Sequence, residues 1–471
     1  MGKAPSGKTK QSSPKNGRSN NNNNGNKKVK DVDDEVVKEF GGPIGCIALM
    51  IFSHAFIYYV WICLEFNNGS ILYPESISDI FPFFERIFGY LKEKAIPNES
   101  SIAIYGGFML FQAILALTMP GLQIKGLPVP SEGNKQLIYN CNGVASWYVT
   151  LATVVILHYT GIFSLSSVQH NFGSLITTAM LFADIFSIFA HITALIKKKA
   201  VRMSGNVIYD FFMGAWLNPR PIGNFDLKFW AETRVAWIML WLLTASAAVS
   251  QWEQTGTVSY GLIFMLIAHG LYTNACMKGE ECIPTTWDVF YEKWGWMLIF
   301  WNFAGVPFFY CAQSVFLMKH PEIQISRNHF FILLAILLFA YYIWDTSQSQ
   351  RNRFRMKLRG TYKPRYAFPQ LPWGTLENPK YLTTKCGGTL LVDGWWKYAR
   401  KIHYTCDVVM GLTWGLACGF THFLPFLYVS FFTSMIIHRY SRDVHRCSRK
   451  YGSDWDRYKK TVPYAFIPYV F

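Results

Sequence analysis

The stretch HFFILLAILLFAYYIWDT, residues 329–346, contains a single acidic residue, Asp345, and no lysine or arginine. A helix needs about 20 mostly apolar residues to cross a bilayer, so this stretch predicts a membrane-spanning helix. Arg351, Arg353 and Arg355 follow shortly after it. Because lysine and arginine collect on the cytosolic side of membranes, this end of the helix is expected to face the cytosol.

Comparable apolar runs lie on both sides of this stretch. Seven are as clean, at residues 43–65, 101–119, 144–166, 173–196, 235–251, 257–276 and 295–317, and a less clean pair follows at 405–418 and 420–437. Only 16% of all residues are charged and 51% are hydrophobic, whereas soluble domains carry about 25% charged residues. The sequence therefore predicts an all-α integral membrane protein, a bundle of about ten transmembrane helices.

The first part of the chain differs from the rest. Residues 1–40 are mostly Lys, Ser, Asn and Gly, with an asparagine run at 20–24, and such a segment cannot bury enough apolar surface to fold. We predict a disordered basic tail at 1–40, cytosolic because of its charge, and one membrane domain at 41–471. The net charge of +16 fits basic cytosolic loops, an anionic ligand, or both.

Several well-known motifs are missing from the sequence. It contains no GxGxxG, no GxxxxGK[ST], no HExxH and no GxSxG. The eleven histidines are dispersed, and the ten cysteines form no CxxC pair. A Rossmann domain, a P-loop, a metal site and a disulfide framework are therefore not indicated, and we expect reduced cysteines.

Two polar segments follow apolar runs in the middle of the chain. The segment Gly205–Arg220 includes an Asn-Pro turn, and it is interpreted either as a functional segment or as a loop anchored by buried ion pairs. Arg351 and Arg355 lie four residues apart, so on a continuing helix they share one face. Two guanidiniums on one face suit a phosphate, and the alternative is contact with lipid headgroups at a helix end.

Two further segments lie near the C-terminus. The segment Gly394–Asp407 combines two tryptophans with His403 and Tyr404. These rings could stack on a nucleotide, or they could belong to an aromatic belt at the membrane interface. The segment His438–Tyr458 follows an apolar run and mixes many basic residues with acidic and aromatic ones. This mixture predicts a polar cavity that opens to the cytosol, with a solvated basic helix as the alternative.

Taken together, the four segments resemble the sterol reductase family, which includes delta-14-sterol reductase, 7-dehydrocholesterol reductase and the lamin B receptor. The resemblance covers about residues 40–471. The stretches Tyr272–Glu281, Phe300–Pro307 and Ala399–Tyr404 are most similar to the fungal branch that reduces the delta(24(24(1))) double bond of ergostane sterols.

The resemblance implies a multi-pass protein of the endoplasmic reticulum membrane that reduces a sterol with NADPH. The sterol would come from the bilayer, among membrane lipids, with no nucleic acid as a partner. The cofactor and active site would occupy about residues 270–471. The positions that match the family's cofactor contacts are Arg351, Arg355, Leu391, Trp396, His403, Tyr404, Arg439, Asp443, Cys447, Tyr451 and Tyr458. Two of them depart from the family pattern, since Arg351 replaces a lysine and His403 replaces the usual asparagine.

The implied chemistry needs an acid. Reduction of an isolated alkene requires a proton before a hydride, so the protein must supply a donor. Tyr272 matches the family's proposed acid, and Asp443 is expected to bond it or relay the proton. The alternative for Tyr272 is a tyrosine that only packs between spans. Two other functions stay open, namely reduction of a ring double bond (delta-14 or delta-7) and a non-enzymatic scaffold of the lamin B receptor type.

Removal of the tail is expected to leave this reaction intact, because its composition cannot form a packed element. A protein that lacks residues 1–37 should turn over at the wild-type rate per folded molecule. The measurement is steady-state turnover, normalised to the folded protein in the membrane fraction. Complete loss of activity in a variant that still inserts normally would contradict this expectation.

Overall fold

Long apolar helices dominate the computed structural model, which describes residues 38–364 and 367–470. Within these residues, seven helical stretches are long and apolar enough to cross a membrane: Gly42–Phe66, Glu99–Thr118, Phe172–Ile196, Leu227–Thr255, Tyr260–Thr285, Trp296–Lys319 and Arg327–Leu358. Each corresponds to a predicted run. A helix satisfies its backbone polar groups internally, which a chain in a bilayer has to do. The prediction of a mostly helical membrane protein is therefore confirmed.

Three of the predicted spans form helices that are too short or too charged to count among these seven. The run at 144–166 forms only α4 (Gly143–Tyr159), a shorter apolar helix. The C-terminal pair forms α16 (Ile402–Leu416) and α17 (Leu427–Tyr451). Neither is among the seven, because α16 has only 15 residues and the second half of α17 is charged. A bundle of about ten spans therefore stays a prediction, and the tail at 1–40 lies almost wholly outside the described residues.

The α-helices not yet given bounds are, in chain order, α1 (Gly42–Phe66), α2 (Ile80–Lys94), α3 (Glu99–Thr118), α5 (Ser167–His170), α6 (Phe172–Ile196), α7 (Val207–Met213), α8 (Leu227–Trp230), α9 (Ala236–Thr255), α10 (Tyr260–Lys278), α11 (Trp287–Phe290), α12 (Trp296–Phe300), α13 (Val306–Tyr310), α14 (Ala312–Lys319), α15 (Arg327–Leu358) and α18 (Ser453–Thr461).

Two of the seven membrane-spanning stretches contain a π-helical turn. The π-helical turn η3 (Ala231–Val235) joins α8 to α9, and η5 (Trp301–Gly305) joins α12 to α13. Such turns occur frequently at functional sites.

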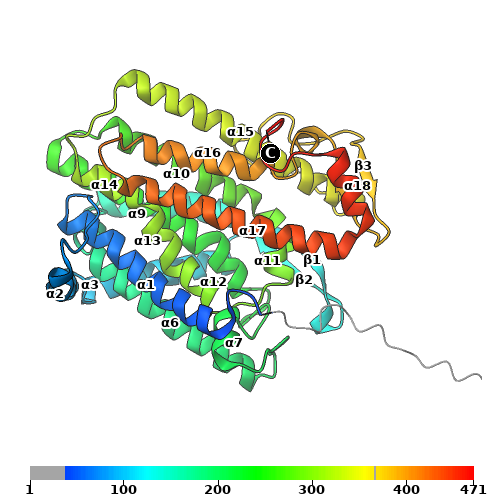
Figure 1. Ribbon diagram of the computed structural model, residues 1–471, viewed down its shortest axis with the longest axis horizontal. Coiled ribbons are helices and arrows are strands. Elements are labelled where there is room, and N and C mark those ends of the chain that lie inside the picture. Colours follow the sequence, from blue (N-terminus) through cyan, green and yellow to red (C-terminus); the bar gives the residue numbers. More distant parts are fainter. Residues whose placement is uncertain (1–37, 365–366, 471) are drawn as a thin grey trace, which may run out of the picture. The chain divides into compact units, whose positions relative to one another are not determined.

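Four helices of the C-terminal half surround the candidate site. In Figure 1, α15, α16 and α17 run side by side, and α10 packs against α15 and α16. Glycine makes the contact between α10 and the end of α16 possible, because a Cβ atom on Gly261 would lie 2.7 Å from the carbonyl oxygen of Ala417. Small residues allow such close approach between membrane helices.

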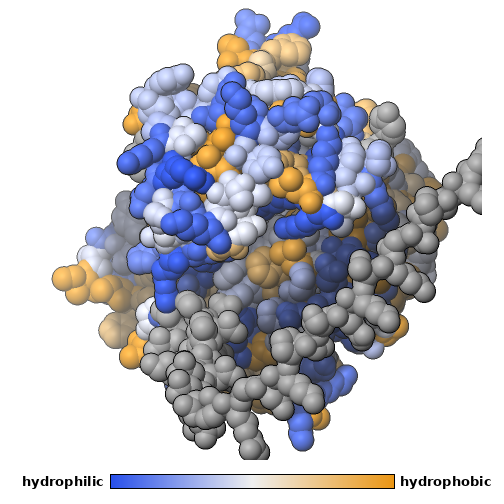
Figure 2. All heavy atoms as spheres, turned by 90° about the vertical axis from the view of Figure 1, so that its right-hand side faces the viewer, coloured by the Kyte–Doolittle hydropathy of each residue, from blue (hydrophilic) through white to orange (hydrophobic). Residues whose placement is uncertain are grey.

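The polar end of this helix group carries the C-terminal elements. Figure 2 looks at the end where α18 and the last turns of α17 lie, and hydrophilic residues predominate there. A surface of this kind belongs outside the hydrocarbon layer. The 3-10 helices η4 (Gly279–Thr285) and η6 (Gly394–Lys397) follow α10 and precede α16, respectively.

Two small hairpins accompany the helices of this mostly helical structure. β1 (Leu122–Val129) pairs with β2 (Lys135–Cys141) in an antiparallel register that begins at Leu122 and Cys141. β3 (Tyr381–Thr383) pairs with β4 (Thr389–Leu391) in the same sense. Both lie between helices. β3 and β4 have only three residues each, too few for an alternating pattern, whereas β2 does alternate, with Leu137, Tyr139 and Cys141 buried. The first hairpin packs on η4, beside the candidate site.

α2 was not predicted either, and it has three distinct faces. Tyr90 stacks on Phe66 with ring centroids 4.1 Å apart, so one face docks on the end of α1. Phe81, Phe84 and Phe88 form a second, exposed face, and charged residues form the third. A helix of this kind, placed at the ends of two apolar helices, fits the interface of a bilayer.

Buried ion pairs anchor the loop that contains Gly205–Arg220, as the structural interpretation of that segment expected. The Nε atom of Arg220 lies 3.2 Å from Asp226. Asp210 accepts hydrogen bonds from the backbone N–H groups of Ser204 and Gly205 at 2.8 and 3.2 Å. These contacts hold the loop beneath the hairpin and leave little reason to assign it to the reaction itself.

Candidate functional site

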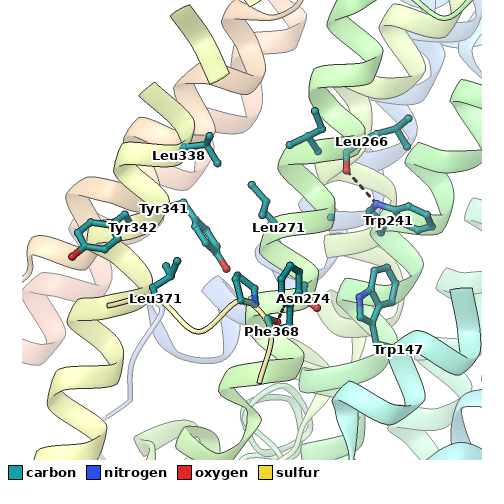
Figure 3. Close-up of a pocket in the computed structure, with 13 residues that line it drawn as sticks. Trp147, Trp241, Leu266, Leu271, Asn274, Leu338, Tyr341, Tyr342, Phe368 and Leu371 are labelled. Carbon is teal, nitrogen blue, oxygen red and sulfur yellow. Dashed lines mark hydrogen bonds between the residues drawn. The ribbon is translucent and has the colours of Figure 1, made fainter. Parts of the chain in front are cut away.

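Two cavities of opposite character lie next to each other between α10 and α15. The larger one, about 710 Å³, is lined mostly by apolar and aromatic side chains of α4, α9, α10, α15 and residues 368–371. In Figure 3, Leu338 and Tyr341 from α15 face Leu271 from α10 across this space. We call it the apolar cavity. Its volume lies in the range of about 300–1,000 Å³ that is usual for small-molecule sites.

The smaller cavity is polar. It measures about 210 Å³ and is lined by residues of η3, α10, η4, α15 and the segment 367–371. Arg351 and Arg355 both line it, as does Glu232. We call it the polar pocket. The prediction that the two arginines share one face of a helix agrees with this arrangement.

A short loop, residues 367–371, separates the two cavities. Leu371 lines both of them. The side-chain amide of Asn274 donates a hydrogen bond of 2.7 Å to the carbonyl oxygen of Phe368, which Figure 3 shows as a dashed line. Lys278 donates to the carbonyl oxygen of Pro369 at 3.0 Å and forms a salt bridge of 2.5 Å with Asp345. α10 and α15 thus hold this wall in place together.

Tyr272 lies on α10 and contacts side chains that line the polar pocket, although it lines neither cavity itself. Its ring packs against Trp237 and Trp344, with centroids 4.8 and 5.2 Å away, and both tryptophans line the polar pocket. The preceding residue, Leu271, lines the apolar cavity. The Tyr272 hydroxyl donates to Asp407 Oδ1 at 3.4 Å. This bond is long, but catalytic hydrogen bonds often tighten only when the ligands are bound.

The acidic partner of Tyr272 differs from the expected one. We expected Asp443, yet Asp443 accepts hydrogen bonds from Lys401 at 2.6 Å and from Arg446 at 2.8 Å. Burial alone would raise the pKa of Asp443, but the charges of Lys401 and Arg446 outweigh burial and hold that pKa below its usual range. Asp407, inside α16, takes the place beside Tyr272 because α16 packs against α10.

Arg351 and Arg355 of α15 have no acidic hydrogen-bond partner within the described residues. The Arg351 guanidinium packs over the Trp396 ring, 4.5 Å from its centroid, and donates to the Gln348 side chain at 2.6 Å. Neither Arg351 nor Arg355 forms a salt bridge within the described part of the chain. Unpaired guanidiniums in a pocket, rather than on a lipid-facing helix end, favour an anionic ligand over headgroup contact.

Several aromatic residues pack behind Arg351, of which Trp396 and His403 are buried and Tyr404 is half-buried. Trp396 is 4% exposed and donates to the carbonyl oxygen of Ser347 at 2.9 Å. Its ring lies 5.2 Å from that of His403, and the His403 ring lies 4.2 Å from that of Tyr404. Leu391 completes the cluster. Because Trp396 is buried, the alternative of an aromatic belt at the interface does not fit it.

The remaining predicted residues form a second group on α17 and α18. Arg439 donates to Asp288 at 2.8 Å, and the Cys447 thiol lies 3.8 Å from Asp443. The rings of Tyr451 and Tyr458 both pack on Trp455. Burial raises the pKa of Tyr458 to about 12, although the charges of Arg400, Arg351 and Arg355 oppose that rise. The second group is therefore within electrostatic reach of the α15 arginines.

Sequence reasoning missed three groups of this site. Asp407 was visible as an ionisable residue within the predicted run 405–418, a feature that by default suggests function, whereas Lys278 lies just beyond the run 257–276. Glu232 lies beyond the Gly205–Arg220 segment and carries no sequence signal of its own. Asp407 and Lys278 bond groups that are distant in the sequence, and no local pattern reveals such pairs.

The described residues form a bundle of apolar helices in which a pocket lined by basic and acidic side chains lies next to an apolar cavity. This arrangement is typical of a membrane-embedded enzyme. The sequence profile of the ergosterol biosynthesis ERG4/ERG24 family matches residues 34–471. The chain belongs to this family, and its enzyme class is that of the sterol reductases.

Named relatives from three organisms illustrate the similarity. The delta(24(24(1)))-sterol reductase erg4A of Aspergillus fumigatus is 43% identical over 93% of this chain and 94% of its own length. The delta(24(24(1)))-sterol reductase of Gibberella zeae is 44% identical over 92% of this chain and 73% of its own. The delta(14)-sterol reductase of Dictyostelium discoideum is 35% identical over 91% of both chains.

Proposed function

We propose that this protein uses NADPH to reduce the delta(24(24(1))) side-chain double bond of an ergostane sterol, the last step of ergosterol biosynthesis, in the endoplasmic reticulum membrane with its tail in the cytosol. Two relatives at 43 and 44% identity bear the name of that activity. The observation that carries the proposal is the environment of Tyr272, a proton donor that bonds Asp407 and packs on two tryptophans of the polar pocket.

The polar pocket fits the phosphates of NADPH. Arg351 and Arg355 would bind them, because two guanidiniums without acidic partners offer several charge-assisted hydrogen bonds. Trp396 holds the Arg351 guanidinium from behind. The other family-matching positions that would contact the cofactor are Leu391, His403, Tyr404, Arg439, Asp443, Cys447, Tyr451 and Tyr458. When bound, NADPH supplies the hydride.

The apolar cavity fits the sterol. Its lining comes from α4, α9, α10 and α15, so a rigid hydrocarbon skeleton would replace lipid contacts with side-chain contacts. The wall at 367–371 keeps this cavity apart from the charged pocket. Asn274 and Lys278 hold that wall through their hydrogen bonds to Phe368 and Pro369.

Tyr272 would protonate the alkene. A proton on the outer carbon leaves a tertiary cation at carbon 24, which the hydride then quenches. Asp407 accepts the Tyr272 hydroxyl bond and so orients the hydroxyl. The Trp237 and Trp344 rings beside Tyr272 are well suited to a developing cation, since aromatic faces attract positive charge.

Reduction of a ring double bond is the second candidate function, because a delta(14)-sterol reductase is 35% identical over most of this chain. Expression in a host that cannot reduce the C-24 side chain separates the two. Sterols are extracted and analysed by mass spectrometry, with Tyr272→Phe as the matched control. We expect a saturated side chain only with the wild-type protein. An unchanged side chain with a newly reduced ring would support the second function instead.

A further inference from the structure

Glu232 is a polar residue of the site that the proposed mechanism does not use. It lies in the π-helical turn η3 and lines the polar pocket together with Arg351 and Arg355. Its Oε1 atom is buried and meets no hydrogen-bond partner among the described residues. A buried polar group without a partner is costly, so such a carboxylate suggests a group that it binds in the working enzyme.

The cations nearest in the sequence are engaged elsewhere. Lys228, four residues earlier, donates to the backbone carbonyl oxygens of Asp288, Val289 and Glu292 at 2.7, 2.9 and 2.7 Å. An ammonium group has three donors, so these bonds use all of them. Arg234, two residues later, forms a buried salt bridge with Glu280. Lys228 and Arg439 still act on Glu232 through space, but no hydrogen bond reaches its Oε1 atom within the described residues.

The pocket combines two kinds of unpaired charge. The guanidiniums of Arg351 and Arg355 come from α15, and the carboxylate comes from η3 at the start of the α9 span. A ligand that matches both has phosphates at one end and hydrogen-bond donors at the other. Carboxylates bind the hydroxyl pair of a ribose in this way in dinucleotide sites.

We propose that Glu232 accepts hydrogen bonds from the hydroxyl groups of the nicotinamide ribose of NADPH. This inference rests on the proposed function. In NADPH only that ribose keeps two free neighbouring hydroxyls, since the adenosine ribose carries the 2′-phosphate, which a carboxylate would repel. Trp237, which also lines the pocket, contacts Tyr272. The nicotinamide half of NADPH would therefore lie near Glu232, on the side of the polar pocket that is closest to Tyr272.

Two ligands distinguish this role from a merely structural one. NADPH contains both riboses, whereas 2′,5′-ADP contains only the phosphorylated adenosine half. The dissociation constants of both are measured for the full-length protein in lipid nanodiscs. For Glu232→Ala we expect a roughly 10- to 100-fold weaker affinity for NADPH and an unchanged affinity for 2′,5′-ADP, which also shows that the variant is folded.

Matched variants complete the experiment. Glu253→Ala, an exposed glutamate near the other end of α9, should change neither constant. If Glu232→Ala does not fold, Glu232→Gln is used, with a smaller selective loss expected. An unchanged NADPH affinity, or an equal loss for both ligands, would overturn the role of Glu232 while NADPH binding stands. A wild-type protein that binds neither ligand would refute the proposed function itself.

Discussion

The Tyr272→Phe enzyme is expected to turn over roughly 10²–10⁴ times more slowly than the wild type, the usual contribution of general acid catalysis. Phenylalanine keeps the ring that packs on Trp237 and Trp344 and removes only the hydroxyl. The affinities for NADPH and sterol should therefore stay nearly normal. The decisive measurement is single-turnover loss of NADPH absorbance beside a cofactor titration.

Two aspartate variants tell which carboxylate supports the acid. Asp407→Asn should slow hydride transfer without weakening NADPH binding, because Asp407 contacts Tyr272. Asp443→Asn should be slow and should also bind the cofactor more weakly, because Asp443 pairs with Lys401 and Arg446 in the cofactor segment. Wild-type chemistry in Tyr272→Phe would mean that another group or an ordered water delivers the proton.

The double variant Arg351→Ala/Arg355→Ala is expected to lose NADPH affinity by roughly 100-fold or more. A hydrogen bond to a charged group contributes about 1.5–3 kcal/mol, and about 1.4 kcal/mol corresponds to a factor of ten, so two lost contacts suffice. The NADH requirement should change far less, because NADH lacks the 2′-phosphate. Steady-state kinetics with both cofactors measure the difference.

A control variant on α15 tests whether the loss of any basic side chain of this helix changes the cofactor preference. Lys357 is exposed and pairs with Glu377 at 3.2 Å, so Lys357→Ala should leave the preference for NADPH intact. Equal losses for NADPH and NADH in the double variant would place the 2′-phosphate away from Arg351 and Arg355. The site would then have to be sought nearer to α17, where Arg439 and Arg446 lie.

The sequence by itself determined the membrane helices. Apolar runs such as 329–346 place their backbone in the bilayer, where no water is present to bond the N–H and C=O groups. A single span therefore forms a helix, which satisfies these groups internally. The spacing of Arg351 and Arg355 likewise determined that both lie on one face of a helix, because positions four apart share a helical face. Both conclusions rest on local periodicity, which needs no knowledge of neighbouring helices.

Only the tertiary structure decided which groups meet. Tyr272 and Asp407 are 135 residues apart, and the choice of Asp407 over Asp443 depends on the packing of α10 against α16. The division into a polar pocket and an apolar cavity arises in the same way, from a loop held by Asn274 and Lys278. Apolar helix faces are nearly interchangeable in lipid, so close side-chain packing and a few polar contacts between helices select the arrangement.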